Sequence, residues 1–229
     1  MASECPFCEG KSAVQQTVFA SCYVRAALQM LKSLFEELAA VFNGYMPIEN
    51  YAQNALLAAS DDTLAVEASK TLAGNALAKP YLDVMSAPDA HPVCKLIKQI
   101  PFDWAPPTTS SDPLYIEHSL AKAHVELLGP NGLVRSDSVR LGLYGMLPDS
   151  EYGVRTHPAN EIYVMLAGEA EWKRADDPYI VHVPGERSYH PSMMEHANRT
   201  TRRAFMSVYV WHGDISTDNY HYAGVPESG

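Results

Sequence analysis

The chain has 229 residues, which is enough for one sizeable domain or for a compact domain with a large extension. A formal net charge of -10 argues against nucleic acid or an anionic membrane surface as the main partner. No run approaches the roughly 18 apolar residues of a membrane span, and the first residues lack the features of a secretory signal, so we expect a cytoplasmic protein.

The first motif along the chain is the cysteine pair Cys5-x-x-Cys8, a spacing found in redox pairs and in halves of zinc sites. No second C-x-x-C is present to complete a zinc site, and Cys22 and Cys94 stand alone. The pair also lies at a chain end rather than at a strand-to-helix junction. These features favour reduced thiols without a functional role.

The segment from residue 12 to 42 has helical periodicity, with apolar residues recurring every three or four positions and no proline or glycine before Gly44. Residues 50–78 predict one or two further helices, with a break near residues 60–62, because alanine is frequent there. An apolar stripe of this kind is typical of packing, either against the rest of the chain or against a second subunit.

Prolines become frequent between Pro80 and Pro113, which indicates a connector broken by a short helical piece at residues 93–100. A polar loop at residues 108–112 ends it. We therefore divide the chain into a helical N-terminal region with its connector, residues 1–112, and a β-domain, residues 113–229.

The β-domain is predicted from short apolar runs that are separated by turn signals such as Asn131-Gly132 and Pro184-Gly185. Such spacing is typical of a sandwich or barrel, so the fold class is mainly β with an α-helical N-terminal region. The predicted strands, besides those around the motifs described next, are residues 121–128, 134–146, 170–174, 179–183 and 204–211.

The most informative strand is residues 162–166, which are β-branched or aromatic and end at a turn signal. Alternation along this strand directs Glu161 and Tyr163 to one face, and His157 can reach the same space from the neighbouring strand. A helix would also place His157 and Glu161 on one face, but Pro158 disfavours it. A second stretch supplies His196, so the sequence predicts a metal site inside a small β-barrel. Two histidines and a carboxylate suit zinc, iron, manganese, cobalt or nickel.

Both stretches resemble the two sequence motifs of the cupin superfamily, which implies a jelly-roll barrel. The first motif is carried by Gly153, His157, Glu161 and Gly168, while its usual first histidine is replaced by Arg155. The second motif is carried by Gly185, Pro191, His196 and Asn198. The resemblance covers about half of the chain.

Within the cupins, the pattern H-x-x-x-E-x-Y without the first histidine resembles the dimethylsulfoniopropionate (DMSP) lyases. The resemblance implies one divalent metal held by His157, Glu161, Tyr163 and His196. It also places Tyr152 and Trp211 near the substrate. The helical extension resembles the longer, DddL-like branch of these lyases, and the superfamily and the apolar helices together suggest a homodimer.

The activity that the resemblance implies is β-elimination of DMSP to dimethyl sulfide and acrylate. Tyr163 is the candidate general base, because a metal beside it would lower the pKa of its phenol, and Tyr152 is the reserve. The sulfonium cation could lie on an aromatic face. The candidates for that contact are Trp211, Tyr144 and Tyr189.

Two further residues are candidate substrate contacts with open alternatives. Arg155 could bind the substrate carboxylate or pair with a surface acid, and His190 could contact substrate or lie at the surface or behind the ligands. Three other functions are also compatible with the motifs: an Fe(II) dioxygenase, a non-catalytic cupin that binds a metal or small molecule, and a sugar isomerase.

Overall fold

The computed structural model describes residues 13–61 and 75–225. Its helices are α1 (Ala13–Val41), α2 (Pro47–Asp61), α4 (Lys79–Met85), α5 (Cys94–Ile97) and α6 (Pro113–Ser119). The cysteine pair Cys5 and Cys8 lies outside the described residues, as does the part of the predicted second helical stretch between residues 62 and 74. Among the residues described, no helix combines the length and the apolar character that crossing a membrane requires.

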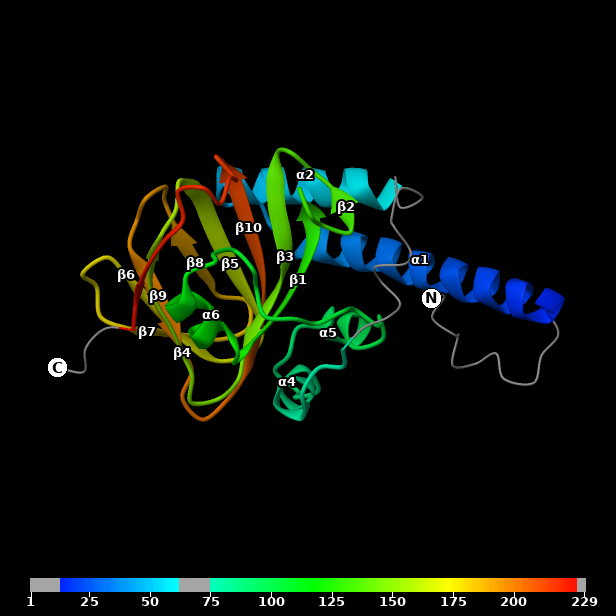
Figure 1. The fold of residues 1–229 in the computed structure, drawn as a ribbon, viewed down its shortest axis with the longest axis horizontal. Coiled ribbons are helices and arrows are strands. Elements are labelled where there is room, and N and C mark those ends of the chain that lie inside the picture. The colour runs from blue at the N-terminus through cyan, green and yellow to red at the C-terminus, as the bar shows by residue number, and fades with distance from the viewer. Residues whose placement is uncertain (1–12, 62–74, 226–229) are drawn as a thin grey trace.

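The strands form two sheets that face each other as a cupin-like β-sandwich (Figure 1). The six-stranded sheet has the order β2-β1-β3-β10-β5-β8, and the five-stranded sheet has the order β11-β4-β9-β6-β7. Their bounds are β1 Lys122–Gly129, β2 Val134–Arg135, β3 Val139–Met146, β4 Glu151–Thr156, β5 Ala159–Gly168, β6 Ala170–Arg174, β7 Ile180–His182, β8 Arg187–His190, β9 His196–Arg199, β10 Phe205–Gly213 and β11 His221–Gly224. The predicted cupin barrel with a helical N-terminal region is confirmed.

Several details differ from the prediction, and local polar contacts that end or start an element explain two of them. The predicted strand 134–146 is divided into β2 and β3, since the Ser136 hydroxyl accepts hydrogen bonds from the backbone of Ser138 and Val139. Helix α6 starts inside the predicted β-domain, where Asp112 Oδ1 caps two backbone N–H groups ahead of a proline at the first helical position. The short strand β11 was also not predicted.

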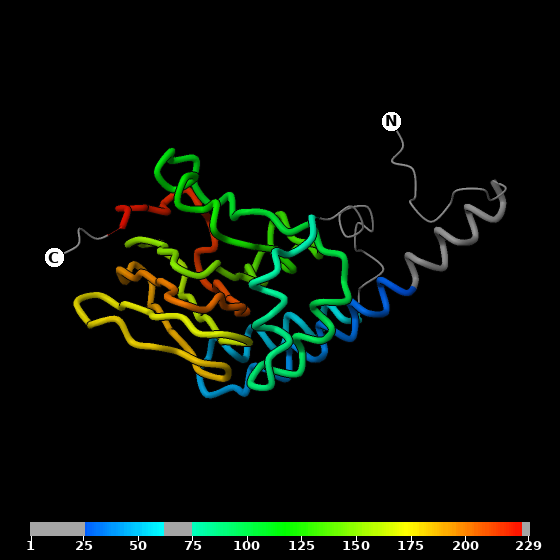
Figure 2. The backbone as a smooth tube through the Cα atoms, turned by 90° about the horizontal axis from the view of Figure 1, so that it is seen from below, coloured from blue at the N-terminus to red at the C-terminus, as the bar shows by residue number. Residues whose placement is uncertain are grey.

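The six-stranded sheet has a hydrophobic core on each of its faces. Its outer face packs against α2 and the second half of α1 (Figure 2). There Leu31, Leu34, Leu38 and Val41 of the predicted apolar stripe are buried, while Ala26 is exposed. Strand β5 confirms the predicted alternation, since Ile162 and Val164 join this outer core while Tyr163 and Met165 join the core between the sheets. Aromatic side chains dominate the inner core, and this is where the metal-ligand motifs point.

A buried ion pair joins the first turn of α2 to the six-stranded sheet. Glu49 is 0% exposed, and its Oε1 accepts a hydrogen bond from Arg187 Nε at 3.1 Å. Its Oε2 accepts another from the backbone N–H of Asn43 at 3.0 Å. Both contacts hold the helical layer in register with β8.

We expect Glu49→Ala to lower the free energy of unfolding by about 3 kcal/mol, because it leaves Arg187 with carbonyl partners but no carboxylate and leaves the Asn43 N–H without its acceptor. This is the lower end for a buried pair, since the Arg187 side chain keeps 21% of its surface exposed. Urea unfolding measures the change. The control is Asp83→Ala, which removes an exposed ion pair with Lys79. A loss within about 1 kcal/mol, the size expected for a surface pair, would contradict this role.

Candidate metal centre

The two histidines and the glutamate that the sequence singled out converge between the sheets. His157 lies in the turn between β4 and β5, Glu161 lies near the start of β5, and His196 begins β9. One ligand atom from each lies within 4.8 Å of the others, and their exposures are only 2%, 1% and 1%. The structure therefore brings His196 next to His157 and Glu161, and all three potential metal ligands are shielded from water.

The backbone fixes which nitrogen of each histidine faces the site. His157 Nδ1 lies 3.2 Å from the Ala159 carbonyl oxygen, and His196 Nδ1 lies 2.9 Å from the Met194 carbonyl oxygen. A carbonyl oxygen only accepts hydrogen bonds, so both Nδ1 atoms carry the proton. Both Nε2 atoms therefore present a lone pair, which is the arrangement that metal-ligating histidines adopt.

These two Nε2 atoms are buried and have no hydrogen-bond partner among the residues that the structure describes. They nevertheless lie 3.4 Å (His157) and 3.0 Å (His196) from Glu161 Oε2, an approach that satisfies the distance of an ion pair but not the geometry of a hydrogen bond. Burial, His190 and Arg155 lower the pKa of His196 well below its ordinary value, which opposes a proton on its Nε2. Lone pairs that face a carboxylate oxygen repel one another unless a cation lies between them, so the donor set fits a divalent transition metal.

The carboxylate of Glu161 is held ionised. Burial alone would raise its pKa, but the three surrounding histidines outweigh burial and set the pKa well below its usual range. Its Oε1 accepts a hydrogen bond from Trp211 Nε1 at 2.6 Å, and its Oε2 accepts one from His190 Nδ1 at 3.0 Å. An anionic carboxylate with fixed orientation is what a hard-to-intermediate metal ion requires.

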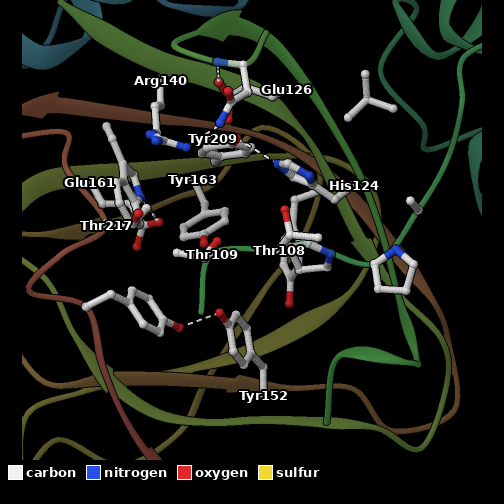
Figure 3. Close-up of a pocket in the computed structure, with 18 of the residues that line it drawn as sticks. Thr108, Thr109, His124, Glu126, Arg140, Tyr152, Glu161, Tyr163, Tyr209 and Thr217 are labelled. Carbon is white, nitrogen blue, oxygen red and sulfur yellow. Dashed lines mark hydrogen bonds and ion pairs between the residues drawn. The ribbon is translucent and has the colours of Figure 1, made fainter. Parts of the chain in front are cut away.

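The centre opens into a cavity of about 430 Å³ whose inner wall is aromatic (Figure 3). The aromatic lining residues are Tyr144, Tyr152, Tyr163, Tyr209, Trp211 and Tyr220. In Figure 3, Tyr163 lies between Tyr209 and Tyr152 and beside Glu161. Burial and the Glu161 charge raise the pKa of Tyr163 well above its ordinary value, while Arg155 lowers it. Tyr163 therefore needs additional positive charge nearby to ionise near neutral pH.

The candidate substrate residues separate into those that line the cavity and those that do not. Tyr144, Tyr152, Arg155 and Trp211 line it. His190 is 0% exposed and lies behind Glu161, with its Nε2 2.8 Å from the Ser188 hydroxyl. Its role as a substrate contact stays a prediction, and the geometry directs both of its nitrogens to protein groups.

Tyr189 projects to the opposite side of β8 from the cavity. It packs against the outer core, and its hydroxyl donates a hydrogen bond to Asn160 Oδ1 at 3.2 Å. It therefore does not line the cavity.

Arg155 brings a permanent positive charge into the cavity wall. It is 2% exposed, and its guanidinium Nη2 donates a hydrogen bond to Asn198 Oδ1 at 3.0 Å. The guanidinium carbon lies 3.9 Å from the centroid of the Tyr152 ring. Among residues 13–61 and 75–225, no carboxylate forms an ion pair with it, so the surface-pair alternative has no support. A buried guanidinium without a carboxylate partner is suited to an anionic ligand.

Sequence reasoning did not identify Tyr209, His124 and Tyr220 as part of the cavity wall. The Tyr209 hydroxyl lies 2.8 Å from His124 Nε2, and burial and Arg140 lower the pKa of His124 to about 4, so its ring is neutral at pH 7. The hydroxyls of Tyr220 and Tyr152 lie 2.5 Å apart. Tyr209 alternates with Trp211 on β10 and could have been found from that spacing. Tyr220 follows no pattern, since it lies in the loop before β11.

Lys122 is a buried amine next to this wall. It is 4% exposed, its Nζ donates a hydrogen bond to the Ser119 hydroxyl at 3.1 Å, and Nζ lies 3.1 Å from the centroid of the Tyr152 ring. Burial and the charge of Arg155 lower its pKa to about 5. The amine is therefore neutral at pH 7, and its contact with Tyr152 is not a cation–π interaction at that pH.

A lysine of the unfolded chain has a pKa of about 10.4, so the unfolded state binds one proton more than the folded state between about pH 10.4 and pH 5. Stability should therefore fall as the pH is lowered through this window, by up to about 1.4 kcal/mol per pH unit. We expect Lys122→Met to raise the free energy of unfolding, with a larger gain at pH 6 than at pH 9. Urea unfolding at both pH values tests this, and an equal gain at both would contradict a neutral lysine.

Comparison with known proteins gives consistent matches. A model of the family described as DMSP lyase, dimethylsulfoniopropionate lyase, matches residues 24–207. The curated relative dimethylsulfoniopropionate lyase DddQ from Ruegeria pomeroyi is 41% identical over 91 residues, which make up 40% of this chain and 45% of that protein. This match therefore spans less than half of the length of the curated relative.

Two solved structures resemble the whole fold. The crystal structure of DMSP lyase DddQ from Ruegeria pomeroyi DSS-3 is 27% identical, with a TM-score of 0.59, 89% of this chain covered and 99% of that one. A structure described with the DMSP lyases RdDddP and RnDddQII is 20% identical, with a TM-score of 0.59 and coverages of 87% and 99%, which supports the fold alone.

Proposed function

Because the chain belongs to the DMSP lyase family, whose model matches residues 24–207, we propose that it is a metal-dependent carbon–sulfur lyase. The reaction is the β-elimination of dimethylsulfoniopropionate to dimethyl sulfide and acrylate. The observation that carries the proposal is the buried group His157, Glu161 and His196, which opens into a cavity with an aromatic wall and an arginine. This arrangement suits a small ligand that carries both a cation and a carboxylate.

His157 and His196 would hold the metal through Nε2 and Glu161 through its carboxylate, with the Tyr163 oxygen as the proposed fourth ligand. When bound, a divalent metal supplies positive charge that lowers the pKa of a neighbouring phenol and stabilises negative charge on a substrate carboxylate as a Lewis acid. Zinc, iron, manganese, cobalt and nickel all suit this donor set. Metal analysis of the purified protein distinguishes them.

Tyr163 is the proposed general base, acting as a phenolate. It removes the proton on the carbon next to the carboxylate, and the electron pair of that C–H bond forms the new carbon–carbon double bond. The bond between the β-carbon and sulfur breaks, and its electron pair leaves with sulfur as neutral dimethyl sulfide. Acrylate remains, and Tyr163 carries the proton until it is lost to water. Tyr152 is the reserve base, since it lines the same cavity.

The cavity wall offers complementary groups for the two charges of DMSP. Arg155 is proposed to bind the substrate carboxylate, because its guanidinium is buried and has no carboxylate partner in the described chain. The sulfonium is proposed to lie against the aromatic faces of Tyr144 and Trp211, a contact worth about 0.5–2 kcal/mol. Arg155→Met should raise KM more than it lowers kcat, and an unchanged KM would contradict the carboxylate role.

Two finer proposals concern the family branch and the assembly. The relatives described above are DddQ proteins, so placement in the longer, DddL-like branch rests on the helical extension alone. A homodimer is proposed from the cupin resemblance, while the part of the apolar helical stripe from Leu31 to Val41 is already buried within this chain. Light scattering of the purified protein tests the dimer, and a monomeric mass would contradict it.

The reaction class is tested by incubating metal-loaded protein with DMSP in sealed vials, once with oxygen excluded and once in air. We expect equal amounts of dimethyl sulfide and acrylate and equal rates in both vials, because elimination consumes no oxygen. Turnover only in air would overturn the lyase and favour a dioxygenase. Binding of DMSP without turnover would instead favour a non-catalytic cupin.

A further inference from the structure

We infer that Trp211 and His190 are positioning residues that set the metal affinity of the site, each by holding one oxygen of Glu161 and covering the ring of one ligand histidine. The inference rests on the proposed metal centre. It gives Trp211 a role in addition to lining the cavity, and it gives His190 a role that requires no contact with substrate.

Trp211 acts on one side of the site. It lies on β10 directly opposite Glu161 on β5, and its indole Nε1 donates a hydrogen bond to Glu161 Oε1 at 2.6 Å. Its ring stacks on the ring of His157, with centroids 4.1 Å apart and an interplanar angle of 25°. One side chain therefore restrains both a carboxylate oxygen and a ligand histidine.

His190 makes the equivalent contacts on the other side. It lies on β8 opposite Glu161, and its Nδ1 donates a hydrogen bond to Glu161 Oε2 at 3.0 Å. Its ring stacks on the ring of His196, with centroids 4.1 Å apart and an interplanar angle of 9°. The Ser188 hydroxyl lies 2.8 Å from His190 Nε2 and fixes the orientation of the ring.

These contacts restrict the motion of the ligand side chains before a metal binds. Metal binding therefore costs less conformational entropy. Glu161 cannot rotate without breaking a hydrogen bond on each side, and neither ligand ring can turn without leaving its stacked neighbour. Partners that orient metal ligands in this way are typically worth about 10–100-fold in metal affinity. Because β5 lies between β10 and β8, the sheet itself places the two positioning residues on either side of Glu161.

The test uses Co²⁺ as the probe, with its dissociation constant measured by competition with a chelating dye and its ligand geometry by the visible absorption spectrum. Trp211→Phe and His190→Phe keep a ring over each ligand histidine but remove the N–H donor to Glu161. We expect each variant to bind Co²⁺ about 10–100-fold more weakly than the wild type and to show an altered spectrum. The matched controls are Trp104→Phe, in the connector outside the cavity, and His182→Phe, on the exposed strand β7.

Folding is monitored by circular dichroism and by thermal unfolding without metal. If His190→Phe fails to fold, Ser188→Ala replaces it, with a weaker loss of Co²⁺ affinity expected because only the orientation of His190 is released. Co²⁺ affinity within about threefold of the wild type in folded variants would overturn the inference. A wild-type protein that binds no Co²⁺, Zn²⁺ or Fe²⁺ would instead overturn the metal centre itself, which is a distinct result.

Discussion

Tyr163→Phe is expected to lower kcat for DMSP cleavage by about 10²–10⁴-fold, the usual contribution of a general base. The substitution removes only the hydroxyl, so the packing of the ring against Trp172, with centroids 4.3 Å apart, is kept. The reason for the loss is that no proton acceptor of comparable position remains beside Glu161. Steady-state kinetics on protein of matched metal content measures the effect.

The matched control is Tyr81→Phe, which removes another buried phenol hydroxyl, one that donates a hydrogen bond to the Ala121 carbonyl oxygen and does not line the cavity. We expect its kcat to stay within about twofold of the wild type. Loss of a hydrogen bond outside the cavity should lower the stability of the protein by about 1 kcal/mol without affecting catalysis. A Tyr163→Phe variant that keeps wild-type turnover would transfer the role of base to Tyr152.

Glu161→Gln is expected to abolish metal binding and activity together. The amide keeps the shape of the side chain but removes the negative charge that faces His157 and His196 at 3.4 and 3.0 Å. We expect metal affinity to fall by more than about 100-fold. This exceeds the loss expected from replacing a residue that only hydrogen-bonds to a metal ligand. Elemental analysis after dialysis and the dimethyl sulfide assay measure the two effects.

Glu171→Gln serves as the control, because Glu171 forms a partly exposed ion pair with Arg199 on the five-stranded sheet. We expect that variant to keep its metal and its activity. If Glu161→Gln retained stoichiometric metal and wild-type turnover, the carboxylate would not be a ligand and the proposed centre would be wrong.

The inner face of β5 is the part of the site that was predictable from sequence. Strand alternation with a period of two fixes Glu161 and Tyr163 on one face and Ile162 and Val164 on the other, and the two hydrophobic cores follow this division. His196 was identified as a candidate ligand because the residues around it have the spacing of the second cupin motif. Local periodicity and motif spacing are both properties of short segments, so the sequence carries them directly.

The contacts around Glu161 were not predictable, because they depend on which strands become neighbours. Trp211 and His190 meet Glu161 only because β10 and β8 pair with β5 on opposite sides in a particular register. Tyr220 reaches Tyr152 from an irregular loop. Register and loop paths are set by the packing of the whole sandwich, so no local pattern in these segments reports them.

Metal-dependent release of dimethyl sulfide tests the central claim most directly. Metal-free protein would be titrated with Zn²⁺, Fe²⁺, Mn²⁺, Co²⁺ or Ni²⁺ in the presence of DMSP, with dimethyl sulfide measured in the gas phase and His196→Ala measured alongside. We predict that the rate rises with at least one metal and saturates at one ion per chain, while His196→Ala releases none at any metal concentration. Equal release from the wild type and the variant, or no release with any of the five metals, would contradict the account.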